Sequence, residues 1–148
     1  RDFWAILYRL VRDGLTVLLT TAYLDEAERC NRVGLMYKGR LIREDGPQAI
    51  RAQMAENCFA ITSDRPRDAR AFLIAQPGVL SAEAAAGALH VFLTENGNRA
   101  RQLTEALREA GHRGVTLRSV MPSLEDVFIA LVRKAELAEA HALGEATR

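Results

Sequence analysis

Residues 15–19 (LTVLL) form a continuous run of aliphatic and β-branched residues, and this run limits the choice of fold most. A run without alternation is typical of a parallel strand that is covered on both faces, as in α/β proteins. Such a strand needs neighbouring strands on each side and helices above and below it. Only one helix, predicted over residues 2–12 from its apolar spacing, precedes the run. Residues 1–56 therefore predict the end of a larger α/β domain whose beginning is absent.

The stretch that follows, residues 20–39, reads TTAYLDEAERCNRVGLMYKG. It predicts a turn, a short helix that begins near Asp25, and an apolar strand over residues 32–37. Acidic residues in a first helical turn are favoured by the helix dipole and by the free N–H groups there. Asp25, Glu26 and Glu28 are therefore interpreted as helix-start residues on a solvated face rather than as catalytic groups.

Lys38 and Gly39 join that strand to residues 40–43, and this arrangement predicts a β-hairpin. Gly46 and Pro47 come next. A proline is well tolerated in a first helical turn, because its missing N–H would have no partner there. We therefore expect a further helix that begins at Pro47.

The stretch TTAYLDEAERC resembles the switch-histidine segment of ABC transporter ATP-binding subunits, especially those of drug and multidrug exporters. In that family, Thr-His is followed after two residues by an acidic pair and Ala. Here Ala22 stands at the histidine position. The likeness covers residues 1–56, and residues 120–132 contain PSLEDVF, which is similar to the motif that closes many exporter-type subunits. The family's phosphate loop, signature motif and Walker B strand precede the matched segment, and the chain has no Gly-Lys-Ser/Thr or Ser-Gly-Gly sequence.

The resemblance implies a part of the ATP-binding subunit of an ABC-type exporter, which energises transport through a membrane permease. ATP and Mg are the cofactors implied for the intact parent. None is expected in this fragment, which has no expected catalytic residue of its own. The family's switch histidine reaches the γ-phosphate and the attacking water, whereas the methyl group of Ala22 can donate no hydrogen bond. Such a bond to a charged group is worth roughly 1.5 to 3 kcal/mol, so we expect a degenerate site that binds ATP and hydrolyses it slowly. The alternative is that Ala22 simply packs and another residue supplies the contact.

The implied partners are a membrane permease and a second ATP-binding domain, fused or separate, with the protein peripheral on the cytoplasmic side of the inner membrane. In relatives with two fused halves the first half tends to lack the switch histidine, so Ala22 favours the end of a first half. No nucleic-acid partner is expected, because a net charge of +1 with interleaved signs lacks a basic block. No apolar run reaches the roughly 18 residues that a membrane span needs. Produced alone, the fragment is expected to form a homo-oligomer, to exchange elements between copies, or to leave its N-terminal part disordered.

Residues 57–133 predict a second unit with the order strand, helix, strand, strand, helix, strand, which is the ferredoxin-like βαββαβ pattern. Its two middle strands, residues 79–83 and 88–93, are expected to turn at Ala86 and Gly87, and the alternation of the second places Leu89, Val91 and Leu93 on one side. The helix expected over about residues 98–110 carries these residues inward: Leu103, Ala106, Leu107 and Ala110. Residues 134–148 predict either a fraying helix or the start of a linker. The expected fold class is therefore an α/β fragment, the C-terminal end of an ABC ATPase domain, followed by a small α+β ferredoxin-like domain with a C-terminal helix. The expected domains are residues 1–56, 57–133 and 134–148.

The PSLEDVF motif predicts a well-capped amphipathic helix. Ser123 is placed to cap it, and Glu125 and Asp126 fall in its first turn. An apolar stripe at helical spacing follows, made of Leu124, Val127, Phe128 and Leu131. We interpret this helix as a packing or dimer-contact element rather than as a ligand site.

The histidines and cysteines share no ligand spacing, so no metal site is expected. His90, His112 and His141 are interpreted as ordinary surface or half-buried residues. Cys30 and Cys58 are interpreted as small buried apolar residues in a reducing compartment.

Two other classes of function remain open at this point. RNA binding by residues 57–133 would need aromatic residues on central strands within a basic frame, and Phe59 and Phe92 lack the ribonucleoprotein signature around them. A ferredoxin-like small-molecule-sensing or dimerisation module would hold an effector between copies, and nothing in the sequence excludes it.

Overall fold

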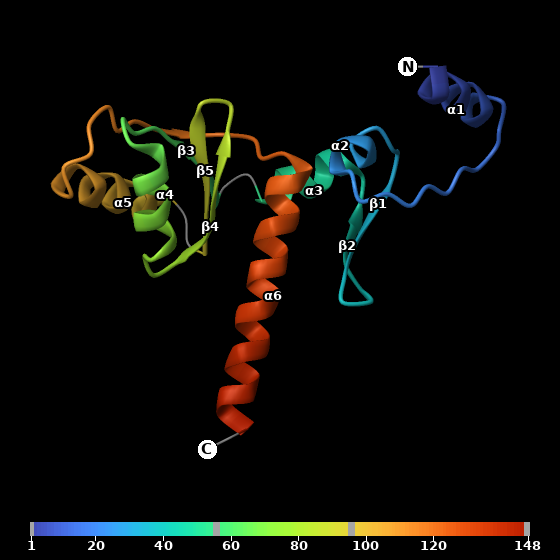
Figure 1. Ribbon diagram of the computed structural model, residues 1–148. Coiled ribbons are helices and arrows are strands. Elements are labelled where there is room, and N and C mark those ends of the chain that lie inside the picture. The colour runs from blue at the N-terminus through green and yellow to red at the C-terminus, as the bar shows by residue number, and fades with distance from the viewer. Residues whose placement is uncertain (1, 55–56, 95–96, 147–148) are drawn as a thin grey trace.

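The computed structural model describes residues 2–54, 57–94 and 97–146, and it shows a mixed α/β chain with two antiparallel sheets (Figure 1). A two-stranded hairpin and a four-stranded sheet lie on either side of the long final helix. The elements in chain order are α1 (Asp2–Arg12), α2 (Leu24–Ala27), β1 (Val33–Tyr37), β2 (Arg40–Asp45), α3 (Pro47–Met54), β3 (Cys58–Ile61), α4 (Pro66–Ile74), β4 (Val79–Ala85), β5 (Ala88–Leu93), α5 (Gly97–Glu109), β6 (Leu117–Ser119) and α6 (Leu124–Ala146).

The predicted parallel strand at residues 15–19 is wrong. The segment between α1 and α2 contains neither helix nor strand, and Leu18 is 95% exposed. A strand is held by hydrogen bonds to a neighbouring strand, and no described strand pairs with these residues. An apolar run therefore does not become a strand of a sheet unless a neighbouring strand pairs with it.

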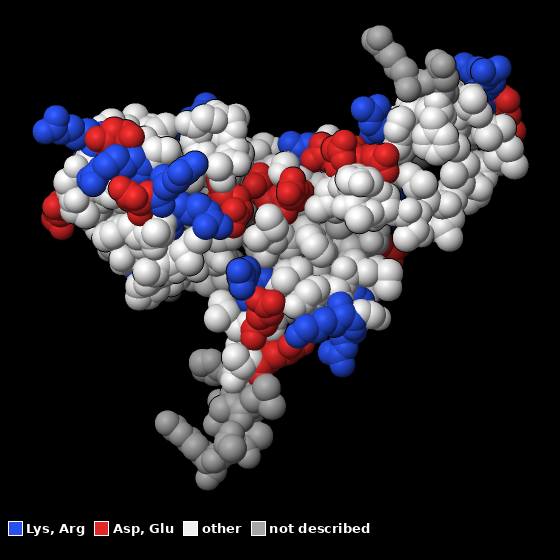
Figure 2. All heavy atoms as spheres, viewed as in Figure 1, with Lys and Arg blue, Asp and Glu red and all other residues white. Residues whose placement is uncertain are grey.

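Helix α1 has the predicted bounds, but it lies apart from the sheets (Figure 1). Its apolar residues Phe3 and Ile6 are 55% and 50% exposed. The ring centroid of its Trp4 lies 5.5 Å from the guanidinium carbon of Arg29, which follows α2. Figure 2 shows a largely uncharged surface over α1 and the segment after it.

Both predicted hairpins are present, and each turns through two residues with positive φ. Lys38 and Gly39 join β1 to β2 with φ values of 48° and 74°, and Ala86 and Gly87 join β4 to β5 with φ values of 48° and 78°. Turns of this hand match the right-handed twist of the strands that they connect. Glycine at the second turn position reaches this φ without the steric cost that a Cβ would add.

The four-stranded sheet has the order β4-β5-β3-β6, and every neighbouring pair is antiparallel. Helices α4 and α5 lie together on one face of this sheet (Figure 1). The core beneath them contains Leu89, Val91 and Leu93 of β5, which confirms the predicted alternation of that strand. Ala110, predicted to point inward, is exposed because α5 ends at Glu109.

A second core lies on the opposite face of the sheet, under α6. It contains Phe92 from β5 and Cys58 from β3 together with Leu124, Val127 and Ala130 from α6. The hairpin and the first helices supply its other buried members, which are Ala27, Val33, Leu35 and Ile50. Residues on both sides of position 56 therefore share one core.

Helix α6 continues through the predicted tail as far as Ala146. Of the two alternatives for residues 134–148, the helix is the one observed up to that residue, and the last two residues lie outside the described chain. Among the residues of α6 whose burial is described, up to residue 140, the buried ones lie in its first part, and the helix beyond them projects away from the sheet (Figure 1).

Candidate functional site

The segment that carries the family resemblance is held in place by a threonine hydroxyl. Thr21 Oγ1 donates a hydrogen bond of 2.7 Å to Glu26 Oε2 and accepts one of 3.0 Å from the backbone N–H of Tyr23. Threonine often closes such local turns ahead of a helix. The side chain of Tyr23, at the N-cap position of α2, makes no capping bond. Thr21 and Glu26 thus fix the turn into α2, which is the helix-start role predicted for Glu26.

Ala22, at the position of the family's switch histidine, lies on the exposed surface of this turn. Its methyl group has no donor, and the hydroxyl of Thr21 beside it already donates to Glu26. The chain also has no Gly-Lys-Ser/Thr sequence to surround a phosphate with N–H groups. This segment therefore supplies neither a hydrogen-bond donor from Ala22 nor a phosphate loop.

Glu28 connects the end of this segment to the start of α6. Its Oε1 accepts a hydrogen bond of 2.9 Å from the backbone N–H of Leu124, the first residue of α6. Arg51 of α3 donates from Nε to the carbonyl oxygen of Pro122 at 2.6 Å, and its Nη1 lies 4.0 Å from Glu28 Oε1. Three helices therefore meet at this junction. The sequence pattern predicts a solvated Glu28 and gives no sign of this contact.

The start of α6 is also capped from within, as predicted. Ser123 Oγ accepts a hydrogen bond of 3.1 Å from the N–H of Asp126, and the N–H of Ser123 donates to Asp126 Oδ2 at 2.9 Å. This is a reciprocal capping box with aspartate in place of the usual glutamate. The stripe of Leu124, Val127, Phe128 and Leu131 packs into the second core, which confirms that prediction too.

Asp126 makes a further contact that the sequence pattern does not predict. His90 Nδ1 of β5 lies 2.9 Å from Asp126 Oδ2, and both side chains are largely buried, with exposed fractions of 13% and 8%. Burial and, to a smaller extent, the negative charge of Asp126 together raise the pKa of the nearby Cys58 thiol to about 12. The sequence feature that could have indicated the contact is the position of His90 on the same face of β5 as Phe92.

The hairpin turn contacts α6 further along its length. Tyr37 donates its hydroxyl hydrogen to Glu136 Oε1 at 2.9 Å, and Lys38 Nζ lies 2.8 Å from Glu139 Oε2. The bond to Tyr37 lowers the pKa of Glu136, and the same bond raises the pKa of Tyr37. The bond to Glu139 raises the pKa of Lys38. These pairs are exposed, so each contributes little to stability.

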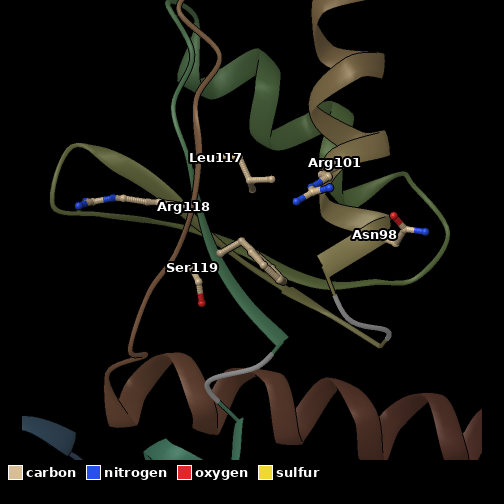
Figure 3. A pocket seen from close by; sticks show the side chains of 6 residues that line it. Asn98, Arg101, Leu117, Arg118 and Ser119 are labelled. Atoms are coloured by element: carbon tan, nitrogen blue, oxygen red, sulfur yellow. The ribbon is translucent and has the colours of Figure 1, made fainter.

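A hollow of about 500 Å³ lies between α5 and the edge strand β6 (Figure 3). Leu117 points toward Arg101 of α5, but Arg118 points away from it, because successive strand residues face opposite sides (Figure 3). The polar groups of this hollow therefore do not converge on one point. Its lining is Phe59, Asn98, Arg101, Leu117, Arg118 and Ser119.

The remaining candidate residues have ordinary structural surroundings. His112 is buried, not at the surface or half-buried as predicted, and its Nδ1 lies 2.9 Å from the hydroxyl of Ser63. Cys58 is buried as predicted, whereas Cys30 is only half-buried, and both are free thiols. The side chain of His141 lies outside the described residues. Among the side chains that are described, no group of three or more His, Cys, Asp or Glu residues could hold a metal ion.

None of the described helices is long and apolar enough to cross a membrane.

Comparison with known proteins places the chain in a family. Residues 46–132 match the family described as ATP-binding protein DrrA1-3-like, C-terminal domain. The daunorubicin resistance ATP-binding protein DrrA2 of Streptomyces coeruleorubidus is 30% identical over 138 residues, which cover 88% of this chain and 42% of that protein. The probable multidrug ABC transporter ATP-binding protein YbhF of Escherichia coli (strain K12) is 44% identical over 57 residues, or 38% of this chain and 10% of that protein.

A third relative, the Nod factor export ATP-binding protein I of Rhizobium sp. (strain N33), is 31% identical over 130 residues, which cover 86% of this chain and 40% of that protein. No solved structure matches the chain. The chain spans less than half the length of each of these relatives. The predicted resemblance to drug-exporter ABC ATP-binding subunits is thus confirmed, and the chain belongs to the family of DrrA1-3-like ATP-binding protein C-terminal domains.

Proposed function

We propose that this chain works as part of the ATP-binding subunit of an ABC-type exporter, which energises transport through a membrane permease. The observation that carries the proposal is the likeness over 138 residues to a daunorubicin resistance ATP-binding protein. The names of the other relatives, which refer to multidrug transport and Nod factor export, support the same role. The permease would select the transported compound.

The chain would divide this work between its parts. Residues 1–56 would be the C-terminal segment of the ATP-binding domain, residues 57–133 an accessory ferredoxin-like domain, and residues 134–148 a tail or linker. The element order β3-α4-β4-β5-α5-β6 and the strand order β4-β5-β3-β6 support the ferredoxin-like assignment. The exposed apolar side chains of Phe3, Ile6 and Leu18 support the packing of the first segment against further parts of an ATP-binding domain.

The complete protein would use ATP and Mg, although this chain supplies no phosphate loop of its own. Its partners would be a membrane permease and a second ATP-binding domain, fused or separate. It would act as a peripheral protein on the cytoplasmic side of the inner membrane.

The proposed role can be tested with the full-length gene product. Binding of Mg·ATP to the purified protein should be saturable, and the protein should move to the membrane fraction when its candidate permease is co-produced. Failure of the full-length protein to bind Mg·ATP would overturn the proposal. A protein that stays in the aqueous fraction beside an inserted permease would overturn the exporter role.

We further propose that the nucleotide site served by this segment is degenerate. The support is Ala22, which is exposed beside Thr21 and carries no hydrogen-bond donor. The variant Ala22→His in the full-length protein should speed steady-state ATP hydrolysis roughly ten- to hundredfold, because a hydrogen bond to a charged group is worth about 1.5 to 3 kcal/mol. Ala22→Ser serves as a smaller polar control. Unchanged hydrolysis in Ala22→His would contradict the degenerate-site hypothesis.

A further inference from the structure

Helix α2 is too short to be stable alone, so its position depends on what it contacts. It has 4 residues, well under the length at which an isolated helix persists in water. The buried side chain of Ala27 anchors one face of it in the second core. Glu28, at its C-terminal end, makes a side-chain hydrogen bond to a residue 96 positions later in the sequence. The contacts with α6 therefore determine where α2 lies.

The N–H of Leu124 is one of the free donors that begin any helix, and such donors need acceptors. Ser123 and Asp126 satisfy other groups at this end, and the carboxylate of Glu28 accepts from Leu124. A carboxylate is favoured there because the N-terminal end of a helix carries partial positive charge. Figure 2 shows acidic side chains gathered over α2 and the start of α6.

The contacts continue from this junction to the middle of the four-stranded sheet. Asp126, in the first turn of α6, lies 2.9 Å from His90 of the central strand β5. The N-terminal end of α6 thus contacts two other elements. Glu28, next to α2, accepts a hydrogen bond from Leu124, and Asp126 contacts His90 of β5. Arg51 holds the carbonyl oxygen of Pro122 just before that end. A continuous series of polar contacts therefore joins α2 to the sheet through α6.

We propose that Glu28 is a positioning residue that makes α2 and α6 move together, so that a displacement of residues 20–28 reaches the four-stranded sheet. The proposal rests on the proposed function in one respect, because it takes residues 20–28 as the switch segment of an ABC ATPase. Coupling between two sites is reciprocal. The accessory sheet and α6 therefore bias the position of the switch segment in return.

The first test uses hydrogen exchange on the full-length protein, without nucleotide. Glu28→Ala should speed exchange in the first turn of α6 roughly tenfold or more, because a helix-end donor loses a charged acceptor. Glu28→Gln, which keeps an acceptor oxygen, should restore part of the protection. Asp25→Ala removes an exposed carboxylate from the same helix and should leave α6 unchanged.

Reciprocity gives the second arm of this test. Ser123→Ala, which loosens α6 from its own side, should speed exchange of the α2 amides as well. If Glu28→Ala behaves like Asp25→Ala, or if Ser123→Ala leaves α2 unchanged, the proposal is overturned. Arg51→Ala provides a second way to weaken the junction if Glu28→Ala does not fold, and it should loosen both helices.

The third arm uses the full-length protein with and without Mg·ATP. In the wild type, the nucleotide should change exchange both in residues 20–28 and in the first turn of α6. In Glu28→Ala the change in residues 20–28 should remain, while the change in α6 disappears. A nucleotide effect confined to residues 20–28 in the wild type overturns this inference. No nucleotide effect anywhere overturns the proposed function instead, because the first two arms do not depend on ATP.

Discussion

At the scale of single residues, the most informative side chain is Asp126, because it serves two elements at once. Its Oδ2 accepts the N–H of Ser123 and lies 2.9 Å from His90 Nδ1. The aspartate therefore closes the cap of α6 and ties that helix to β5. Its charge also acts on Cys58, whose pKa it helps to raise.

Cys58 should be far less reactive than Cys30. Burial raises the pKa of the Cys58 thiol from 9.0 to about 12, and only the thiolate is nucleophilic. At pH 8 the native chain should therefore be alkylated by iodoacetamide at Cys30 at least about tenfold faster. Peptide mass spectrometry after timed labelling measures both rates, and labelling in denaturant provides the control. Equal rates in the native chain would show that Cys58 is not protected.

The same pKa shift predicts a loss of stability in alkali. A thiol whose pKa is raised by folding favours the folded state fully below its unfolded value, and this contribution is lost as the pH rises. For Cys58 the loss should run from about pH 9.0 to about pH 12.

At the scale of elements, α6 owes its start to a local signal and its direction to distant contacts. The PSLEDVF motif places Ser123 and Asp126 as a capping box, which the structure confirms. Tyr37 and Lys38 of the hairpin then contact its later turns at Glu136 and Glu139. The helix therefore spans the distance from the sheet unit to the hairpin.

Loss of the Ser123 cap should destabilise the chain measurably. Ser123→Ala removes the acceptor for the N–H of Asp126, and replacement of such a cap by alanine typically costs about 1 kcal/mol. Urea denaturation followed by circular dichroism measures the change. Ser119→Ala, at an exposed site on the edge strand β6, is the matched control and should be nearly neutral. Equal midpoints for the two variants would contradict the capping role.

At the scale of the whole molecule, the four-stranded sheet separates two cores. One core lies under α4 and α5, and the other lies under α6 and also contains Val33, Leu35 and Ile50. Residues from both sides of position 56 therefore stabilise each other. The two proposed units should unfold with some dependence on one another.

Phe92→Ala should test this dependence directly. Phe92 is 1% exposed in the second core, and truncation of a buried phenylalanine typically costs roughly 3–5 kcal/mol. Native-state hydrogen exchange should show faster exchange in β1 and α3 as well as in the sheet. Leu73→Ala, in the other core, should first loosen α4 and α5. If Phe92→Ala leaves β1 and α3 as protected as before, the two units are independent.

Most helices and both hairpins could be predicted from the sequence, because their signals are local. Helix α1 has the predicted bounds, Pro47 opens α3, and Ser123 caps α6. The alternation of Leu89, Val91 and Leu93 predicted that these side chains share one face of β5, and in the structure that face lies in the core under α4 and α5. Each of these signals lies within a few residues of the structure that it determines.

Only the tertiary structure decided the rest. Residues 15–19 have the composition of a buried strand, yet no described strand supplies their hydrogen bonds, so they remain outside both sheets. Glu28 looked like a solvated helix-start residue, but its acceptor oxygen meets a helix that begins 96 positions later. His90 likewise meets Asp126 across 36 positions. Composition and spacing determine what a segment can form by itself, whereas a partner that is distant in sequence is set by how the elements pack.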